Sequence, residues 1–494
     1  MTLDASKPLE IKRVVVTGAT GLIGAQLVRE LLVKGIEVIA LSRDPQAARQ
    51  KTGLPAEWLK WASHLDAFPL PNLDGVDAVI HLAGENVGEG RWSPDRKKEI
   101  LDSRIESTQK ILRAFEETPP VNRPKVFLCA SAIGIYGDTS DSAHPDGELR
   151  GDSPVPAFPQ GEGADVLSLK GSAFLAAVTQ SWEREALKVQ SLGVRTVLLR
   201  TGIVLDPQSG ALGKLLPIFS SGGGGPSGSG RQWMSWIHLG DEIRAILFLM
   251  EHPSLQGAMN LTAPEAVSNS EFARTLGQVL HRPAFLPAPA PALRAALGEM
   301  GDLVLGGQRV VPDGLLKAGF QFQFPKLELA LEDLCGGVRR NATLKRDRQW
   351  VPRPLEQVFQ FFCDEKNLEA ITPPWLNFKV LGKSTPEIEK GTLIDYQLSL
   401  HGIPMKWRTE IAVWEVNQVF VDQQLKGPYK QWHHTHRFTP VKGGTLIEDE
   451  VAYKLPIGML GQLFGGAYVR NDVSKIFAYR HQVIEQTFGG MPKE

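Results

Sequence analysis

Near its start the chain reads Ile11-Lys-Arg-Val-Val-Val-Thr-Gly-Ala-Thr-Gly-Leu-Ile-Gly24. The β-branched run that ends at Thr17 is typical of a buried strand, and the apolar spacing that begins at Leu22 is typical of a helix. Gly35 then stands where a left-handed helix cap belongs, and residues 36–42 form a second apolar run. A strand, a glycine-rich turn, a helix and a second strand within about 30 residues predict a βαβ unit.

Further apolar runs continue this alternation. Strands are predicted at residues 78–82, 125–130 and 195–199, with helical stretches between them. This order predicts an α/β fold with a doubly wound parallel sheet over residues 11–280. Prolines and short helical patterns follow as far as Gly337, so we expect a small α-rich extension over residues 281–337.

The chain changes character from Ala342 onward. Four successive antiparallel strands are predicted, at residues 407–414, 418–424, 432–438 and 445–453, followed by a helix over about 460–486. One helix over a curved antiparallel sheet predicts a separate α+β domain at residues 342–488, with room for a cavity. The Gly/Ser-rich residues 220–230 are, by composition alone, a flexible linker. The alternative is a substrate loop, because the run leads directly into the motif that contains Trp236 and His238.

Composition excludes several functional classes. The 494 residues carry 54 Lys+Arg and 55 Asp+Glu, so no excess of positive charge favours nucleic acid as a partner. The three cysteines are far apart, which disfavours a disulfide framework and suits a reducing compartment. The first residues lack the pattern of a signal peptide, and no apolar run reaches the ~18–20 residues that span a bilayer. We therefore expect a cytoplasmic protein without a membrane span.

The glycine-rich turn predicts a dinucleotide site. Its backbone N–H groups and the start of the helix can hold a pyrophosphate, and a Cβ there would block the phosphate. The alternative is a tight turn that binds nothing. The predicted cofactor contacts of this turn are Gly18, Thr20, Gly21, Leu22, Ile23 and Gly24.

The end of the second strand bears on the choice of cofactor. An acidic residue about 20 positions after the glycines would bind a ribose hydroxyl of NAD. The chain reads Leu41-Ser-Arg-Asp44 there. Arg43 can pair with a 2′-phosphate and Ser42 can donate a hydrogen bond to it, which favours NADP, while Asp44 keeps NAD possible. A solvated surface charge is the alternative for Arg43.

Longer motifs accompany this turn, namely His81-Leu-Ala-Gly84, Arg91-Trp-Ser93, Ser103-Arg-Ile-Glu-Ser-Thr108, Ser131-Ala-Ile-Gly-Ile-Tyr-Gly137, Leu199-Arg-Thr-Gly-Ile-Val-Leu205 and Gly228-Ser-Gly-Arg-Gln-Trp-Met-Ser-Trp-Ile-His-Leu239. With them, residues 11–335 resemble the extended short-chain dehydrogenases/reductases. The match is most specific to an atypical "epimerase family" branch, often filed as sugar-nucleotide epimerases. The resemblance implies a Rossmann domain. The further cofactor contacts expected are Leu82, Ala83, Gly84, Arg200, Gly202 and Val204, and the expected substrate contacts are Arg91, Trp92, Trp236 and His238.

The resemblance also implies a catalytic Ser or Thr with a Tyr-x-x-x-Lys pair, in which the lysine lowers the pKa of the tyrosine. Ser131 matches the serine, but the pair is missing. If the chain is aligned on Glu183, the two positions fall at Leu175 and Thr179. Tyr136 is therefore the candidate acid beside Ser131, and packing beside the cofactor is its alternative role.

Residues from about 342 to 488 resemble the START-like superfamily of polyketide cyclases/dehydrases (SRPBCC), on Val351-Pro-Arg-Pro-Leu-Glu-Gln-Val-Phe-Gln-Phe-Phe362 and Asn367-Leu-Glu-Ala-Ile-Thr-Pro-Pro-Trp375. This resemblance implies a helix-grip fold and a hydrophobic ligand. His434 and His436 would share one face of a strand, with His433 on the other. Because no third ligand is visible in the sequence, we expect no metal there. Simple exposure at the surface is the favoured interpretation, and contacts with a cationic or proton-sensitive ligand are the alternative.

Two functions follow from these observations. The first is an NADP-dependent oxidoreductase or epimerase acting on a small carbonyl or hydroxyl substrate, with an attached domain that binds a hydrophobic ligand. The second is a non-catalytic, NADP-responsive binding or regulatory protein, which the missing Tyr-x-x-x-Lys pair favours. Some relatives are labelled cell-division inhibitors, so a regulatory role in division belongs to this second function.

Overall fold

The computed structural model describes residues 8–62, 70, 72–140, 146–158, 166–400, 402–456 and 458–491, leaving out the side chains of 458–465. The chain separates into two units, with the boundary along the chain between Gly336 and Gly337; the short segments 32–35 and 49–55 are grouped with the second unit. Among the described residues, no helix has the length and apolar character needed to cross a membrane. The finer division at residues 281 and 342 stays a prediction.

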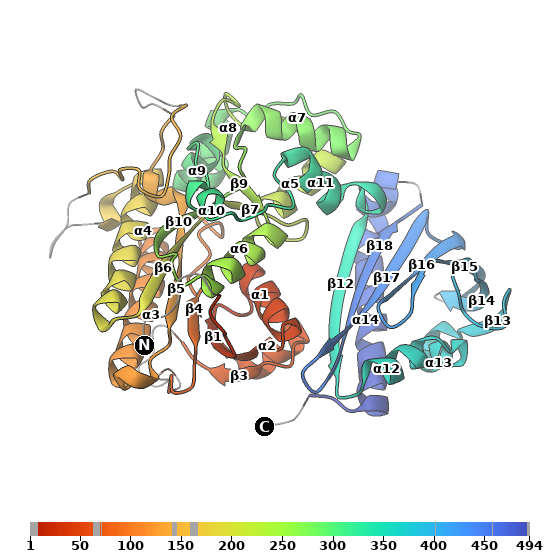
Figure 1. Ribbon diagram of the computed structural model, residues 1–494. Helices are drawn as coiled ribbons and strands as arrows, with labels where there is room; N and C mark the ends of the chain where they lie inside the picture. Colours follow the sequence, from red (N-terminus) through yellow and green to blue (C-terminus); the bar gives the residue numbers. More distant parts are fainter. Residues whose placement is uncertain are drawn as a thin grey trace. The chain divides into compact units, whose positions relative to one another are not determined.

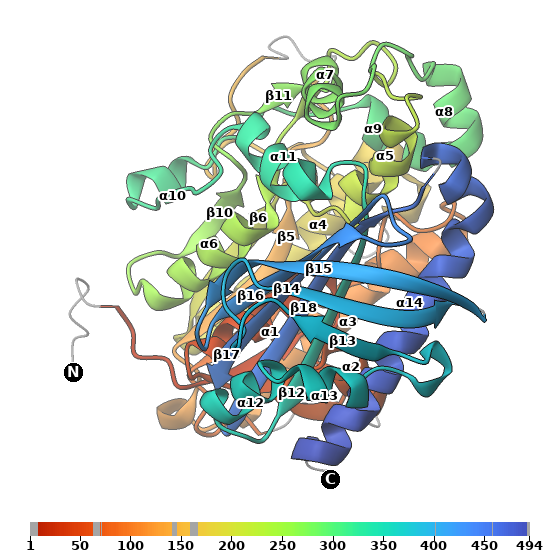
Figure 2. The same cartoon turned by 90° about the vertical axis from the view of Figure 1, so that its right-hand side faces the viewer.

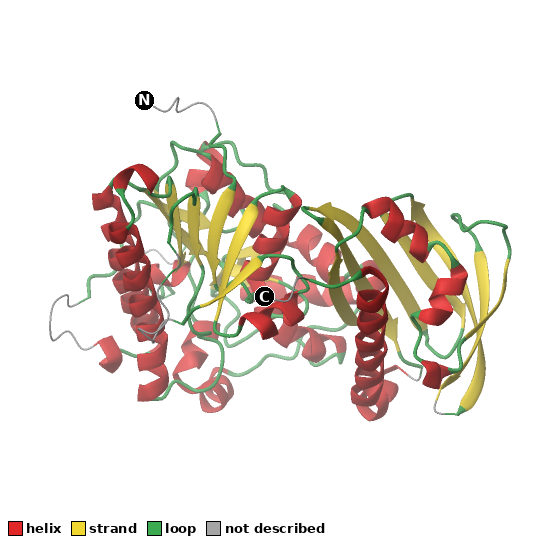
Figure 3. Ribbon diagram, turned by 90° about the horizontal axis from the view of Figure 1, so that it is seen from below, coloured by secondary structure: helices red, strands yellow, loops and turns green. Residues whose placement is uncertain are grey.

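The first unit is built on a seven-stranded parallel sheet. Its spatial order is β10-β6-β5-β4-β1-β2-β3. The strands are β1 (Arg13–Thr17), β2 (Glu37–Ser42), β3 (Glu57–Lys60), β4 (Ala78–His81), β5 (Val126–Ala132), β6 (Arg195–Thr201) and β10 (Gly257–Leu261). The central strands are almost wholly buried because helices cover both faces of the sheet (Figure 3).

Helices α3 (Pro94–Glu117) and α4 (Gly171–Leu187) cover one face of this sheet, and α1 (Leu22–Val33) and α6 (Leu239–Glu251) cover the other (Figure 1). On the α3/α4 face, Phe115 and Trp182 pack against Val15 and Phe127 of the strands in one apolar core. The helix α2 (Pro45–Thr52) follows β2. The predicted doubly wound α/β fold is confirmed.

The remainder of the first unit surrounds a second apolar core. It contains α5 (Gly210–Ser220), α7 (Asn269–Leu280), α8 (Ala290–Leu297), α9 (Gly301–Leu305), α10 (Asp313–Lys317) and α11 (Leu327–Cys335), with the short strand pairs β7 (Ile203–Leu205)/β9 (Trp236–His238) and β8 (Trp233–Met234)/β11 (Val267–Ser268). Leu331 of α11 and Phe272 of α7 lie in the same core. The α-rich extension is therefore packed into the first unit.

The Gly/Ser-rich residues 220–230 differ from the linker that composition predicts. Gly228 donates its N–H to the carbonyl of Ala288 at 2.8 Å, and the carbonyl of Gly230 accepts from Ser270 N–H at 2.8 Å. A Cβ on Gly225 would stand 2.0 Å from the carbonyl oxygen of Leu286. The glycines allow close backbone packing here, a use that composition cannot distinguish from flexibility.

The second unit is a seven-stranded antiparallel sheet with one long helix. The order is β12-β18-β17-β16-β15-β14-β13. The strands are β12 (Thr343–Val351), β13 (Lys379–Lys383), β14 (Leu393–Leu400), β15 (Ile403–Glu415), β16 (Val419–Lys426), β17 (Gln431–Val441) and β18 (Gly444–Lys454). Helix α14 (Gly458–Phe488) lies against one face, and α12 (Leu355–Phe362) and α13 (Glu365–Ala370) lie side by side at one end (Figure 1, Figure 2). This arrangement confirms the predicted helix-grip fold class.

Candidate functional site

The predicted nucleotide site lies at the carboxyl ends of β1, β2 and β4. The chain runs outward from β1 to β2 and β3, then returns to β4 on the opposite side of β1. Doubly wound sheets bind ligands in the crevice at such a reversal of strand order. The glycine turn, the end of β2 and the segment after β4 are therefore brought to one edge of the sheet.

The three positions of the turn require glycine for different structural reasons. Gly18 has a φ of 66°, and a Cβ there would lie 2.7 Å from the carbonyl carbon of Leu82. A Cβ on Gly24 would lie 2.1 Å from the carbonyl oxygen of Gly18. A Cβ on Gly21 would meet nothing closer than 3.2 Å. Packing of the chain itself thus requires Gly18 and Gly24, whereas Gly21 leaves the start of α1 open to a phosphate; Thr20, Leu22 and Ile23 lie in the same turn and the start of α1.

Thr17 links the turn to the segment after β4. Its hydroxyl oxygen accepts the N–H groups of Leu82 and Ala83, each at 3.1 Å, and lies 2.7 Å from Nδ1 of His81. Burial, and then the charge of Arg104, lower the pKa of His81 to about 3, so its imidazole is neutral. The expected contacts Leu82 and Ala83, followed by Gly84, are thereby held beside the glycine turn.

At the end of β2, Arg43 is exposed, whereas Asp44 is bonded to the backbone of the next helix. The Arg43 side chain is 84% exposed, with Nη1 3.7 Å from Oε1 of Glu85. The Asp44 carboxylate accepts the N–H of Ala47 at 2.9 Å and so caps α2, and the Ser42 hydroxyl accepts the N–H of Asp44 at 3.2 Å. Arg43 is placed to reach a ligand at this edge, while Asp44 is engaged in the helix cap.

Ser131 belongs to a buried polar network. Its hydroxyl donates to Oε1 of Glu183 in α4, with 2.6 Å between the oxygens. Arg200 of β6 holds the same carboxylate through Nε at 2.8 Å and Nη2 at 2.9 Å. All three side chains are buried. Arg200, an expected cofactor contact, therefore directs its guanidinium into this network.

The structure places the Tyr136 hydroxyl in the same network. It lies 2.7 Å from the carbonyl oxygen of Arg150 and 2.8 Å from Oδ1 of Asn260, and it accepts a hydrogen bond from Nη1 of Arg200 at 2.9 Å. Tyr136 is buried, and burial raises the pKa of its phenol. This placement favours the packing role over that of an acid exposed to substrate.

Two of the expected substrate contacts, Arg91 and Trp92, have intramolecular partners. Arg91 donates through Nη2 to the carbonyl of Ala295 near the end of α8, at 2.8 Å. The indole of Trp92 donates to the carbonyl of Val87 at 2.9 Å and packs edge-on against Phe174. Their role toward a substrate stays a prediction.

Trp236 lies within the second core of the first unit, and His238 lies at the start of α6. Trp236 is 0% exposed and packs in the core that includes Phe272. His238 caps α6 by accepting the N–H of Gly240 at Nδ1, and its ring stacks on Phe324 at 3.9 Å. This burial does not favour direct contact with a substrate. Gly202 and Val204 lie nearby, just after β6 and in β7.

Glu183 belongs to the Ser131 network but is not among the site residues that the sequence predicts, where it serves only as the reference for aligning α4. It lies four residues after Thr179 on the buried side of α4. A carboxylate on a buried helix face requires a charged or hydrogen-bonding partner. That signal was available in the sequence, but the partner Arg200 is on a strand and becomes visible only in the fold.

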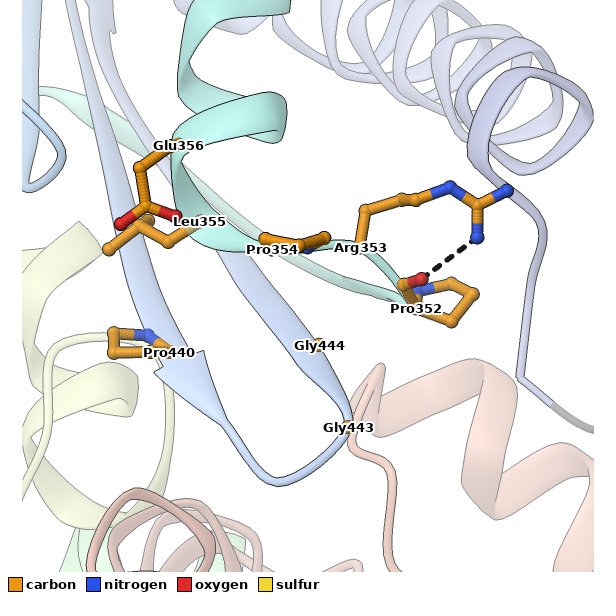
Figure 4. Close-up of a pocket in the computed structure, with 8 residues that line it drawn as sticks. All are labelled: Pro352, Arg353, Pro354, Leu355, Glu356, Pro440, Gly443 and Gly444. Carbon is orange, nitrogen blue, oxygen red and sulfur yellow. Dashed lines mark hydrogen bonds between the residues drawn. The ribbon is translucent and has the colours of Figure 1, made fainter.

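In the second unit the predicted hydrophobic cavity between α14 and the sheet stays a prediction. Aromatic side chains, including Phe359 and Phe438, form an apolar core there. A pocket of about 360 Å³ lies elsewhere, where α12 begins and β17 turns into β18 (Figure 4). It is lined by Pro352, Arg353, Pro354, Leu355, Glu356, Pro440, Gly443 and Gly444, and it contains none of the predicted site residues.

Three family models match the chain. The NAD dependent epimerase/dehydratase family matches residues 14–159, a domain of unknown function, DUF1731, matches residues 288–334, and the polyketide cyclase/dehydrase and lipid transport family matches residues 351–473. The first two matches fall in the first unit, and the third falls in the second.

Comparison with individual proteins indicates the same family as the first of these models. The chain is 38% identical over 319 residues to the epimerase family protein ML0860 of Mycobacterium leprae, covering 64% of this chain and 94% of that protein. It is 34% identical to the epimerase family protein YfhF of Bacillus subtilis, covering 65% and 97%. The crystal structure of human epimerase family protein SDR39U1 (isoform2) with NADPH matches with a TM-score of 0.55 and 32% identity, over 65% of this chain and 98% of that one. The chain therefore belongs to the epimerase family, with a polyketide cyclase/dehydrase domain following its Rossmann domain.

Proposed function

We propose that the protein is an NADP-dependent oxidoreductase or epimerase acting on a small carbonyl or hydroxyl substrate. The observation that supports NADP as the cofactor is made at the end of β2, where the Arg43 side chain is 84% exposed while Asp44 caps α2. A guanidinium at this position suits a 2′-phosphate, and the Asp44 carboxylate, which would bind the ribose hydroxyls of NAD, is engaged in capping α2. The human relative crystallised with NADPH supports this choice.

The proposed chemistry uses Ser131 and Glu183. A bound nicotinamide would accept or supply the hydride. Because the Ser131 hydroxyl hydrogen points to Glu183, its oxygen offers lone pairs to a substrate hydroxyl. When the substrate alcohol is oxidised, its proton passes to Ser131 Oγ as the serine's own proton passes to the carboxylate. Arg200 fixes that carboxylate in position through its ion pair.

The second candidate is a non-catalytic, NADP-responsive binding protein whose second unit carries a hydrophobic ligand. The buried Tyr136 hydroxyl favours it, because the phenol is held by Arg200 and Asn260 and has no lysine beside it among the described residues. In this case NADP binding would change the affinity of the second unit for its ligand without any turnover.

Single-turnover measurements on the full chain distinguish the two. NADPH oxidation with a panel of aldehydes and ketones, and NADP⁺ reduction with the matching alcohols, should reveal at least one substrate pair. Ser131→Ala should slow that reaction about 10²–10⁴-fold and leave the NADPH dissociation constant unchanged. If no pair reacts, but NADPH alters binding of an apolar fluorescent probe, the regulatory function replaces the enzymatic one.

A further inference from the structure

A second polar cluster lies inside the second unit, between the sheet and α14. His434 and His436 project from the same face of β17, with ring centres 3.7 Å apart. Asp422 of β16 is opposite His434 in the strand register, and Asp449 of β18 is opposite His436. Arg480 of α14 completes the cluster. Two imidazoles and two carboxylates are therefore concentrated in a largely buried space.

Asp449 orients both imidazoles. Its Oδ1 lies 3.0 Å from Nε2 of His434 and 2.7 Å from Nδ1 of His436. An ionised carboxylate only accepts hydrogen bonds, so each ring turns an N–H toward it. A carboxylate behind a histidine is the usual outer partner of a metal-binding imidazole, because it fixes the tautomer and strengthens the ring as a ligand.

The opposite nitrogens converge on Asp422. Its Oδ2 lies 3.6 Å from Nδ1 of His434 and 3.0 Å from Nε2 of His436, and the three potential ligand atoms lie within 4.8 Å of one another. Ligands at ~2.0–2.1 Å from a four-coordinate Zn²⁺ are about 3.3 Å apart. Small side-chain adjustments would therefore enclose an ion.

Charge balance also favours a cation beside Asp422. Arg480 lies 3.4 Å from Oδ1 of Asp449 and compensates that carboxylate on the far side of the imidazoles. Asp422 is contacted by the two imidazoles, and the charge of Arg480 also acts on it through space. A metal ion between the rings would lie directly beside this carboxylate and compensate its negative charge. The Asp422 side chain is 21% exposed, against 9% and 6% for His434 and His436, so it provides the route from solvent.

We propose that Asp422, His434 and His436 bind one divalent transition-metal ion of the Zn²⁺ type, with Asp449 as the residue that positions both imidazoles. Two histidines and one carboxylate leave at least one coordination position for water or a ligand group. The sequence predicts no metal because the third ligand is brought to the pair by the register of β16 with β17, which the sequence alone does not specify. The site is independent of the proposed oxidoreductase function.

Equilibrium dialysis of the chelator-treated full chain against ZnCl₂, followed by elemental analysis, tests this proposal. We expect one Zn²⁺ per chain, with affinity reduced at least 100-fold in Asp422→Asn and in His436→Gln. His433→Asn is the matched control, because this neighbouring histidine lies on the other face of β17, and it should bind Zn²⁺ like the parent. Stoichiometric binding that both ligand variants retain, or no binding by the parent, would overturn the proposal.

X-ray absorption of the Zn²⁺-loaded parent protein provides a test that requires no variant to fold. It should show two imidazoles and oxygen ligands at about 2.0–2.1 Å. A spectrum without two imidazoles would overturn the assignment even if a single ion binds. Asp449→Asn should weaken binding while keeping the same two-imidazole spectrum, which separates a positioning residue from a ligand.

Discussion

Ser131 donates its hydroxyl hydrogen to Glu183 across 2.6 Å, a distance typical of a hydrogen bond to an ionised carboxylate. Arg200 holds both oxygens of that carboxylate, so the direction of the Ser131 hydrogen bond is fixed. The serine can therefore accept a hydrogen bond from a substrate alcohol more readily than it can donate one to a carbonyl. The missing tyrosine–lysine pair would normally provide that donor.

Glu183→Gln tests this arrangement. The amide can still bond to Ser131, but it cannot take up a proton at neutral pH, so alcohol oxidation should fall at least ~10²-fold while NADPH affinity is kept. Pre-steady-state formation of NADPH measures the effect. Glu185→Gln, in the same helix but bonded to Lys188 and Gln109 and not to Ser131, is the control. Unchanged oxidation in Glu183→Gln would exclude the carboxylate from the proton path.

Arg43→Ala should weaken NADPH binding by roughly 1–3 kcal/mol, which is the contribution of a charge-assisted contact. It should leave NADH binding unchanged. Fluorescence titration of the full chain with each cofactor measures this. Asp44→Asn keeps a side chain that can cap α2 and should leave the preference unaltered. Equal affinity of the parent protein for NADPH and NADH would contradict the proposed role of Arg43.

Tyr136→Phe should lower the free energy of unfolding by about 1–3 kcal/mol, because Arg200, Asn260 and the Arg150 carbonyl lose a buried partner. Urea unfolding measures the loss, and Tyr468→Phe, at an exposed position in α14, should have little effect. NADPH affinity and turnover should stay near the parent values. A hundredfold loss of turnover without loss of stability would instead establish Tyr136 as the acid.

Glu242 should make stability depend on pH. Burial, against a hydrogen bond from Thr201, raises its pKa from 4.5 to about 8. Between these values the folded chain keeps a proton that the unfolded chain has lost, so the free energy of unfolding falls as pH rises, by up to about 4–5 kcal/mol. Glu242→Gln should remove this component, as seen in urea unfolding at pH 5, 6.5 and 8. The exposed Glu116→Gln is the control, and its free energy of unfolding should differ from that of the parent by the same amount at each pH. If Glu242→Gln behaves in the same way, the prediction is contradicted.

The two units should fold separately. A fragment ending at Gly337 should bind NADPH, and a fragment starting at Arg339 should unfold cooperatively as an α+β domain, since β12 begins only at Thr343. Circular dichroism during thermal unfolding checks both fragments. If neither fragment unfolds cooperatively, the proposed boundary is wrong.

Local sequence patterns predicted much of the fold but little of how side chains are used. The β1–α1–β2 unit follows from apolar spacing and glycines. In contrast, β12 was missed because charged residues interrupt it; in the sheet, Arg346 and Arg348 pair across to Glu450 and Glu448 of β18. The same limit applies to the sites. The contact of Arg200 with Glu183 depends on how α4 packs against β6, and that of Asp422 with His434 depends on the register of β16 with β17. Local sequence patterns do not specify either.

The packing around the glycine turn has an evolutionary consequence. Gly18 and Gly24 are required by the backbone whether or not a nucleotide is bound, since a Cβ would collide with Leu82 or with Gly18. A descendant that had lost its cofactor would be held to both glycines by folding alone, and its motif would look almost intact. Substitution at Gly21, which has room for a methyl group to within a few tenths of an ångström, would be the first sign of that loss.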